Sequence, residues 1–159
     1  MPSAKGEILA LAAFLGICLS VSAIGGVMTA AGVSDWYQTL AKPSFNPPDW
    51  VFAPVWTTLY VMMAVAGWRV WRHRHHGIAT APLTAFAVQL ALNLAWTGLF
   101  FGLRLIGTAA AESAILLAAI ILTARLFWRV DRVAGLLFLP YIVWVGFATV
   151  LTLAIWRLN

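Results

Sequence analysis

Residues 8–33 read ILALAAFLGICLSVSAIGGVMTAAGV and contain no charged side chain. An α-helix rises about 1.5 Å per residue, so this run is long enough to cross the roughly 30 Å hydrocarbon core of a bilayer. It is also longer than the apolar core of a cleaved signal peptide, which spans about 7–15 residues. We therefore expect a retained first membrane span at about residues 8–31.

Four further apolar segments follow, and they predict spans at about residues 50–71, 79–103, 106–127 and 133–156. Of the 159 residues, 63% are hydrophobic and 9% are charged, whereas soluble domains are about 45–50% apolar and about 25% charged. A chain this short cannot bury so much apolar surface in a water-soluble globule. The sequence predicts an all-α integral membrane protein, a single five-helix transmembrane bundle that occupies residues 1–159 as one domain.

Residues 34–49, SDWYQTLAKPSFNPPD, form the least apolar stretch and connect the first two predicted spans. Ser34 and Asp35 are good helix N-caps, which predicts a short helix that ends at about Ala41. Pro43, Pro47 and Pro48 exclude regular helix beyond it. We expect a Pro-rich loop with one short helix at this position.

The net charge of +5 comes from basic residues at the ends of the apolar segments. Five spans place two loops on the side of the N-terminus, and by the positive-inside rule the more basic side faces the cytoplasm. The N-terminus is therefore predicted to be cytoplasmic, and no basic groove with interleaved aromatic residues indicates a nucleic acid partner. That side holds Lys5, Arg69, Arg72, Arg74, Arg125, Arg129 and Arg132, against Lys42, Arg104 and Arg157 on the other.

Nine tryptophans are the most unusual feature of the composition. Six lie near predicted span ends, where indole rings favour the membrane–water interface. Trp56, Trp96 and Trp144 lie inside the spans instead, and helical spacing places Gln89 and Asn93 on the same stripe as Trp96. Amides are costly against lipid, so both should face the bundle interior. The pattern fits either a packed, hydrogen-bonded core or a cavity for a flat, apolar ligand.

Three other features give weaker indications. Glu112 is the only acid within a predicted span; it is either a functional carboxylate or one that reaches the interface or Arg104. Gly98 and Gly102 form a GxxxG motif that allows close helix approach and offers a dimer contact. We expect no metal site, because the histidines at 73, 75 and 76 lie in an Arg-rich loop without cysteine or carboxylate partners.

Residues 36–37 and 42–60, WY and KPSFNPPDWVFAPVWTTLY, closely resemble the signature of the translocator protein family. Its members are also called tryptophan-rich sensory proteins or peripheral-type benzodiazepine receptors. Residues 89–96 with 100–102, and residues 140–144, match two further blocks of that family. The resemblance implies five transmembrane helices, usually a homodimer, and a pocket open toward the loop between the first two spans.

The resemblance also implies porphyrin ligands such as protoporphyrin IX, and isoquinoline or benzodiazepine drugs. It implies a receptor or sensor that regulates tetrapyrrole metabolism or a stress response, with no separate cofactor. The alternatives are a light-dependent porphyrin-degrading enzyme, for which Trp56 and Trp144 would be the catalytic residues, and a transporter of tetrapyrrole or lipid. The ligand-binding residues implied by the resemblance are Tyr37, Pro47, Trp56, Asn93, Trp96, Trp144 and Ala148.

One departure from the family pattern concerns cholesterol. Animal members end the last helix with a short motif that contains a tyrosine, and Leu153 occupies that tyrosine's position here. Such motifs are weak even when complete. We therefore expect a bacterial member, in the cell membrane, that does not use cholesterol as its ligand.

Overall fold

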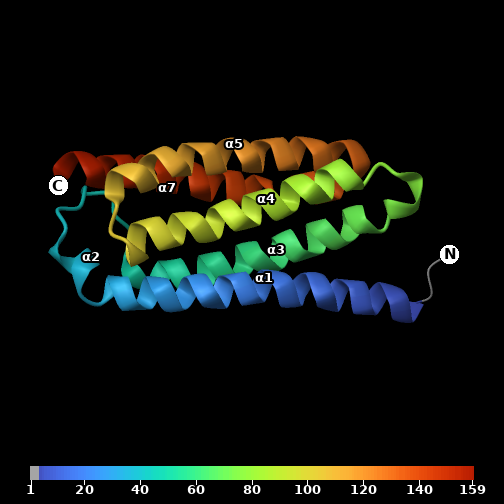
Figure 1. Ribbon diagram of the computed structural model, residues 1–159, viewed down its shortest axis with the longest axis horizontal. Helices are drawn as coiled ribbons and strands as arrows, with labels where there is room; N and C mark the ends of the chain where they lie inside the picture. The colour runs from blue at the N-terminus through green and yellow to red at the C-terminus, as the bar shows by residue number, and fades with distance from the viewer. Residues whose placement is uncertain (1–3) are drawn as a thin grey trace.

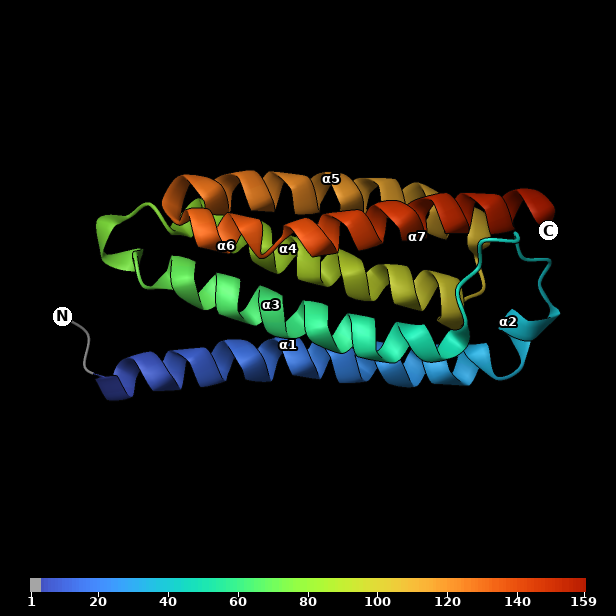
Figure 2. The same cartoon turned by 180° about the vertical axis from the view of Figure 1, so that it is seen from behind.

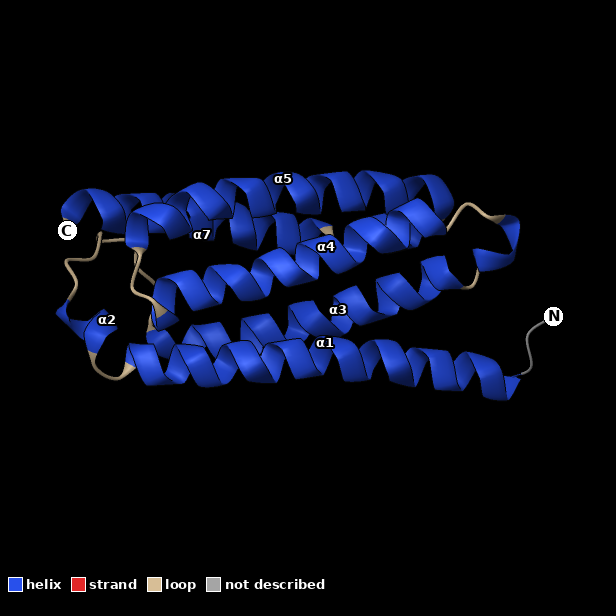
Figure 3. Ribbon diagram, viewed as in Figure 1, coloured by secondary structure: helices blue, strands red, loops and turns tan. Residues whose placement is uncertain are grey.

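The computed structural model describes residues 4–159, apart from the side chain of residue 76, and every regular element in that range is a helix (Figure 3). Within the described residues, five helical segments are long and apolar enough to cross a membrane, which confirms the predicted fold class. The elements are α1 (Ala4–Val33), α2 (Trp36–Thr39), η1 (Asp49–Val51), α3 (Phe52–Trp71), η2 (Arg74–His76), α4 (Thr80–Thr97), η3 (Gly98–Gly102), α5 (Ile106–Val130), α6 (Arg132–Leu136) and α7 (Leu139–Leu158).

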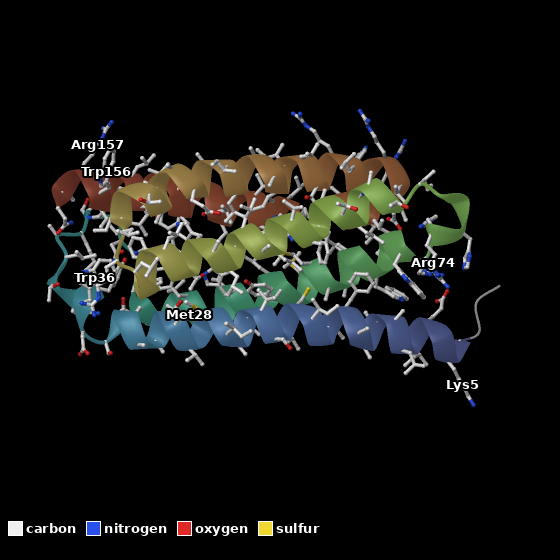
Figure 4. The ribbon with its side chains drawn as sticks, in the orientation of Figure 1. Lys5, Met28, Trp36, Arg74, Trp156 and Arg157 are labelled. Atoms are coloured by element: carbon white, nitrogen blue, oxygen red, sulfur yellow. The ribbon has the colours of Figure 1, made fainter. Side chains whose placement is uncertain are left out.

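The long helices run up and down in one elongated bundle (Figures 1 and 2). Helix α1 lies along one edge and packs on α3, while α5 packs on both α4 and α7. The N-terminal end of α1 and the loop between α3 and α4 lie at one end, and α2 lies with the C-terminus at the other (Figure 1). We call these the basic end and the α2 end; Lys5 and Arg74 are labelled at the first, Trp36 and Arg157 at the second (Figure 4).

The fifth span differs from the prediction of one continuous helix at 133–156. It consists of α6 and α7, with a turn at Leu137 and Phe138 between them. Pro140 has no N–H to donate to the carbonyl of Leu136, and its ring would clash with that carbonyl in a continuous helix. The break therefore falls directly before the proline, which occupies the first turn of α7.

The short helix between the first two spans is also smaller than predicted. Helix α2 is a single turn that ends at Thr39 rather than at Ala41, and the Asp35 side chain does not cap it. The loop after it is held by other bonds. Gln38 donates to the Asp49 carboxylate at 2.7 Å, and the Asn159 side-chain amide bonds both the N–H and the carbonyl of Ala41 at 3.0 Å.

The glycines of the GxxxG motif face α1 of the same chain. They lie in η3, a π-helical turn in which the Leu103 N–H donates to the Gly98 carbonyl at 2.8 Å. A Cβ at either Gly98 or Gly102 would stand 3.4 Å from the terminal methyl of Met28, which lies on α1 near the α2 end (Figure 4). The motif therefore provides close packing within the chain, and a homodimer stays a prediction.

Aromatic rings fill the half of the bundle nearer the basic end. Phe86, Phe127 and Phe138 come from α4, α5 and the turn before α7, and all three are buried. Their ring centroids lie 5.1–6.4 Å apart, within the range favoured for aromatic pairs. This half is a packed core.

Asp131 joins the fifth span to the second. Its carboxylate accepts a hydrogen bond from the Ala134 N–H at 3.1 Å, which caps α6, and pairs with Arg69 of α3 at 2.9 Å. Burial alone would raise the pKa of this carboxyl, but the Ala134 amide and the Arg69 guanidinium outweigh it and hold the pKa below its usual range. A lowered pKa stabilises the fold above the unfolded value of about 3.9.

We expect Asp131→Ala to lower the free energy of unfolding by about 1–3 kcal/mol, because it removes a cap and leaves Arg69 unpaired. Asp131→Asn should cost less, since asparagine can still cap the helix. Thermal unfolding in detergent measures both. The wild-type protein should be more stable than Asp131→Asn at neutral pH. This difference in the free energy of unfolding should disappear as the pH falls below about 4 and through the folded pKa of Asp131, because the carboxylate becomes protonated. Asp35→Ala is the control, since Asp35 makes no cap, and an equal loss there would contradict the assignment.

Candidate ligand-binding cavity

A cavity of about 480 Å³ lies between α1, α3, α4 and α7 in the half of the bundle toward the α2 end. This volume lies within the range of about 300–1,000 Å³ that is typical of small-molecule sites. Its wall is largely apolar, with a few hydroxyl and amide groups. The lining residues are Ser22, Ala23, Gly25, Gly26, Thr29, Ala30, Val33, Asp49, Phe52, Ala53, Trp56, Thr57, Tyr60, Asn93, Trp96, Thr97, Phe101, Trp144 and Ala148.

The three internal tryptophans line this one cavity from three different helices. Trp56 of α3 contacts the Tyr60 ring with centroids 5.9 Å apart. Trp96 of α4 stacks on Phe100 at 5.4 Å, and Trp144 of α7 meets Phe52 edge-on at 6.0 Å. The indole N–H groups of Trp96 and Trp144 are buried without a hydrogen-bond partner among the described residues. The cavity wall is therefore rich in aromatic faces, which suits a flat, apolar molecule.

A chain of buried hydrogen bonds runs beside the cavity and joins three helices. The Tyr60 hydroxyl of α3 donates to the Asn93 side-chain carbonyl at 2.8 Å, and the Asn93 amide donates to the Tyr141 oxygen of α7 at 2.7 Å. Tyr141 in turn donates to the Gln89 side-chain carbonyl at 2.9 Å. Gln89 and Asn93 are both buried, so the expectation that these amides face the interior is confirmed.

Five of the seven predicted ligand-binding residues line the cavity: Trp56, Asn93, Trp96, Trp144 and Ala148. Tyr37 does not; it is buried against Phe100 and Phe101 and donates to the Asn46 side chain at 2.6 Å. Burial, with a smaller contribution from the charge of Asp49, raises the pKa of Tyr37 to about 12. The phenol therefore stays protonated at neutral pH and supports the cavity wall through Phe101.

Pro47, the other exception, lines a second and larger hollow on the outer surface. This groove of about 910 Å³ runs between α3 and α7, and apolar residues such as Leu59 and Val143 form its walls. Trp144 lines both the outer groove and the inner cavity, and no other lining residue is shared between them. The Trp144 ring is therefore part of the partition between the two spaces.

The sequence interpretation missed the contribution of α1 to the cavity. Seven residues of this helix line the wall: Val33 and six small residues, the bulkiest of which is threonine. Their concentration between Ser22 and Ala31 was a usable signal, because a stretch of small residues in a membrane span indicates close approach of another surface. The missed set is Ser22, Ala23, Gly25, Gly26, Thr29, Ala30 and Val33.

Glu112 lies on α5 and is not among the residues that line the cavity. Both of its carboxylate oxygens are buried, and neither has a hydrogen-bond partner among the described residues. Arg104, the partner considered from the sequence, instead places its guanidinium 5.8 Å from the Trp36 ring. Among the side chains that the structure describes, which do not include that of residue 76, no group of three histidine, cysteine or acidic residues could hold a metal ion.

Comparison with known proteins shows what the chain is similar to. The sequence model of the TspO/MBR family matches residues 14–157. The chain is 41% identical to the tryptophan-rich protein TspO of Chlorobaculum tepidum, over 96% of this chain and 98% of that one. It is 37% identical to the protein CrtK of Rhodobacter capsulatus, over 89% and 88% of the two chains. It is also 37% identical to the translocator protein of Sus scrofa, over 87% and 86%.

The hydrogen-bond chain generates a graded prediction. Tyr141→Phe should destabilise the protein more than Tyr60→Phe, because it leaves both the Asn93 amide and the Gln89 carbonyl unpaired, whereas Tyr60→Phe leaves one carbonyl unpaired. We expect roughly 1–3 kcal/mol for the first and about half of that for the second. Thermal unfolding in one detergent measures both. An equal loss, or the reverse order, would show that these bonds do not hold the three helices together.

Proposed function

The chain belongs to the TspO/MBR family, and from that premise we propose that it is a membrane receptor or sensor that binds porphyrins in the cavity between α1, α3, α4 and α7. The observation that carries the proposal is the convergence of Trp56, Trp96 and Trp144 on one cavity. Three helices each contribute an indole ring to the lining of the same cavity, which suits a flat aromatic macrocycle. The related proteins are named as TspO, sensory and translocator proteins, in keeping with a receptor role.

Polar groups would orient the ligand within this apolar site. Asn93, Tyr60 and Thr97 lie along one wall, and Asp49 lies where the cavity approaches the α2 end. Asn93 is already bonded to two tyrosines, so its position is fixed before any ligand arrives. A pre-organised wall of this kind binds with less loss of conformational entropy than one that must order on binding.

A light-dependent porphyrin-degrading enzyme is the second candidate. Trp56 and Trp144 both line the cavity, so a bound porphyrin that is excited by light would lie against two oxidisable indole rings. A transporter of tetrapyrrole or lipid is the less favoured candidate, because such a protein needs a route to the opposite side of the membrane. The cavity residues lie in the half near the α2 end, and the other half of the described bundle is filled by rings such as Phe86, Phe127 and Phe138.

Protoporphyrin IX binding tests the receptor proposal. We expect saturable binding by the wild-type protein, followed through the absorption of the porphyrin itself. Trp144→Phe should weaken the affinity by about 2–10-fold, the value of one aromatic contact. Trp50→Phe is the matched control: Trp50 is 75% exposed and is not among the cavity-lining residues. Equal affinity for the wild type and both variants would reject this cavity as the porphyrin site.

Illumination of the same samples separates the receptor from the enzyme. An enzyme should give a discrete porphyrin product, identified by absorption and mass, whose yield falls sharply in the Trp56→Phe/Trp144→Phe double variant. Trp50→Phe/Trp128→Phe is the control, since it removes two indoles that are not among the cavity-lining residues. A receptor without this activity should bleach porphyrin at the rate of free porphyrin in the same detergent.

A further inference from the structure

A surface hollow of about 380 Å³ lies at the basic end, where α5 meets α6 and the first turns of α7. Arg125 and Arg129 line it from α5, one helical turn apart, with Trp128 between them in the sequence. Residues four apart lie on the same helix face, so the two guanidinium groups can reach one anion together. Nitrogen-tipped side chains stand outward from α5 near this end (Figure 4).

Both arginines are exposed, and neither has an ion pair or hydrogen bond with any residue of the described chain, 4–159. Two acids at this end already have partners: Asp131 pairs with Arg69 at 2.9 Å, and Glu7 pairs with Arg72 at 3.3 Å. Arg125 and Arg129 therefore present two cationic groups whose charge the chain itself does not balance.

The inner part of the hollow is apolar. Helix α6 approaches α5 so closely that a Cβ at Gly135 would stand 2.8 Å from the Cβ of Trp128. Ile121 of α5 and Ile142 of α7 continue the wall. Helix α5 runs toward the basic end and α7 runs away from it, so both isoleucines lie deeper along the bundle than the arginines (Figures 1 and 2). The hollow is cationic at its outer end and apolar toward the middle of the membrane.

We propose that this hollow is a binding site for an anionic glycerophospholipid. The phosphodiester would lie between the Arg125 and Arg129 guanidinium groups, which match the geometry of phosphate oxygens. The Trp128 ring would lie at the level of the glycerol backbone, where indole is favoured. One acyl chain would follow Ile121, Leu139 and Ile142. The combination of paired cations with an apolar wall, at a span end, favours a lipid over a soluble phosphate.

The test compares phosphatidylglycerol with phosphatidylcholine of the same acyl chains, each added to the purified protein in a neutral detergent. Phosphatidylglycerol should raise the unfolding temperature by several degrees more than phosphatidylcholine, because it binds the folded protein. Native mass spectrometry should show one retained phosphatidylglycerol. Arg125→Gln/Arg129→Gln should weaken its binding roughly 30-fold, the value of two basic groups at an anionic surface.

Two matched controls make the result specific. Arg132→Gln/Arg157→Gln removes the same charge from exposed arginines that do not line the hollow, and it should retain the lipid effect. Leu139→Trp should fill the hollow and expel the lipid without a change of charge, whereas Leu136→Trp, on the exposed face of α6, should not. Equal loss in the two arginine double variants would reject the site in favour of diffuse charge attraction. Equal stabilisation by glycerol phosphate would show an anion site without lipid specificity.

A second inference comes from Trp144 and rests on the proposed function. Its ring is the only lining element shared by the inner cavity and the outer groove, and it contacts Phe52 on the cavity side and Phe147 on the groove side, at 6.0 and 5.7 Å. The Trp144 indole N–H is buried and bonds to no described residue. Apolar packing and ring contacts hold this side chain, so it can turn without breaking a hydrogen bond.

We infer that an apolar ligand dissolved in the bilayer enters the cavity sideways through the α3–α7 groove, with Trp144 as the gate. Val143→Trp would narrow the groove from outside: Val143 is 72% exposed and lines only the groove. It should slow both association and dissociation of protoporphyrin IX by a similar factor, about 5-fold or more, and leave the dissociation constant within about 2-fold. Stopped-flow absorption measures both rates.

Val88→Trp, on an exposed position of α4 outside both hollows, is the matched control and should leave the rates unchanged. Unchanged rates in Val143→Trp, with normal saturable binding, would place the entrance elsewhere and leave the receptor proposal intact. Absence of saturable binding by the wild-type protein would overturn the receptor proposal itself, and the route with it.

Discussion

The side-chain amide of Asn93 makes the two hydrogen bonds on which the rest of this bundle depends. It bonds Tyr60 of α3 through its oxygen and Tyr141 of α7 through its nitrogen. The hydrocarbon of a membrane offers no water to replace either bond, so helices that meet at this point have one preferred register. Tyr60 and Asn93 also line the cavity, which means that the same bonds that hold α3, α4 and α7 together shape its wall.

This hydrogen-bond chain separates two halves of the bundle that are built differently. Toward the basic end the helices meet through interlocking phenylalanine rings such as Phe127 and Phe138, 5.1 Å apart. Toward the α2 end, α1 presents small side chains instead, and the space that they leave remains open between tryptophans on the facing helices. Small residues along one helix and large flat ones on its neighbours are therefore the reason that this half has a cavity and the other half a core.

The sequence predicted the number of spans because long apolar runs have a single physical explanation. It also predicted the inward-facing amides, since an amide against lipid is costly. It did not predict that Tyr37 and Pro47 would lie outside the cavity, because their positions depend on how the loop folds rather than on helical periodicity. Gln38, Asp49 and Asn159 fix that loop, and Asn159 is more than a hundred positions away from the Ala41 backbone that it bonds. The contribution of α1 was missed for a related reason: small residues mark close packing, but not which surface they approach.

The break before Pro140 explains why the surface hollows gather around the fifth span. The proline interrupts the helix, and directly before the break α6 brings Gly135 against Trp128 of α5. Leu139, the first residue of α7, lines both the outer groove toward α3 and the surface hollow at the basic end, toward α5. Five residues further along, Trp144 separates that groove from the inner cavity. Pro140, which cannot donate a backbone hydrogen bond, thus lies at the break in the span whose residues line all three of these hollows, and the side chains on either side of that break form their shared borders.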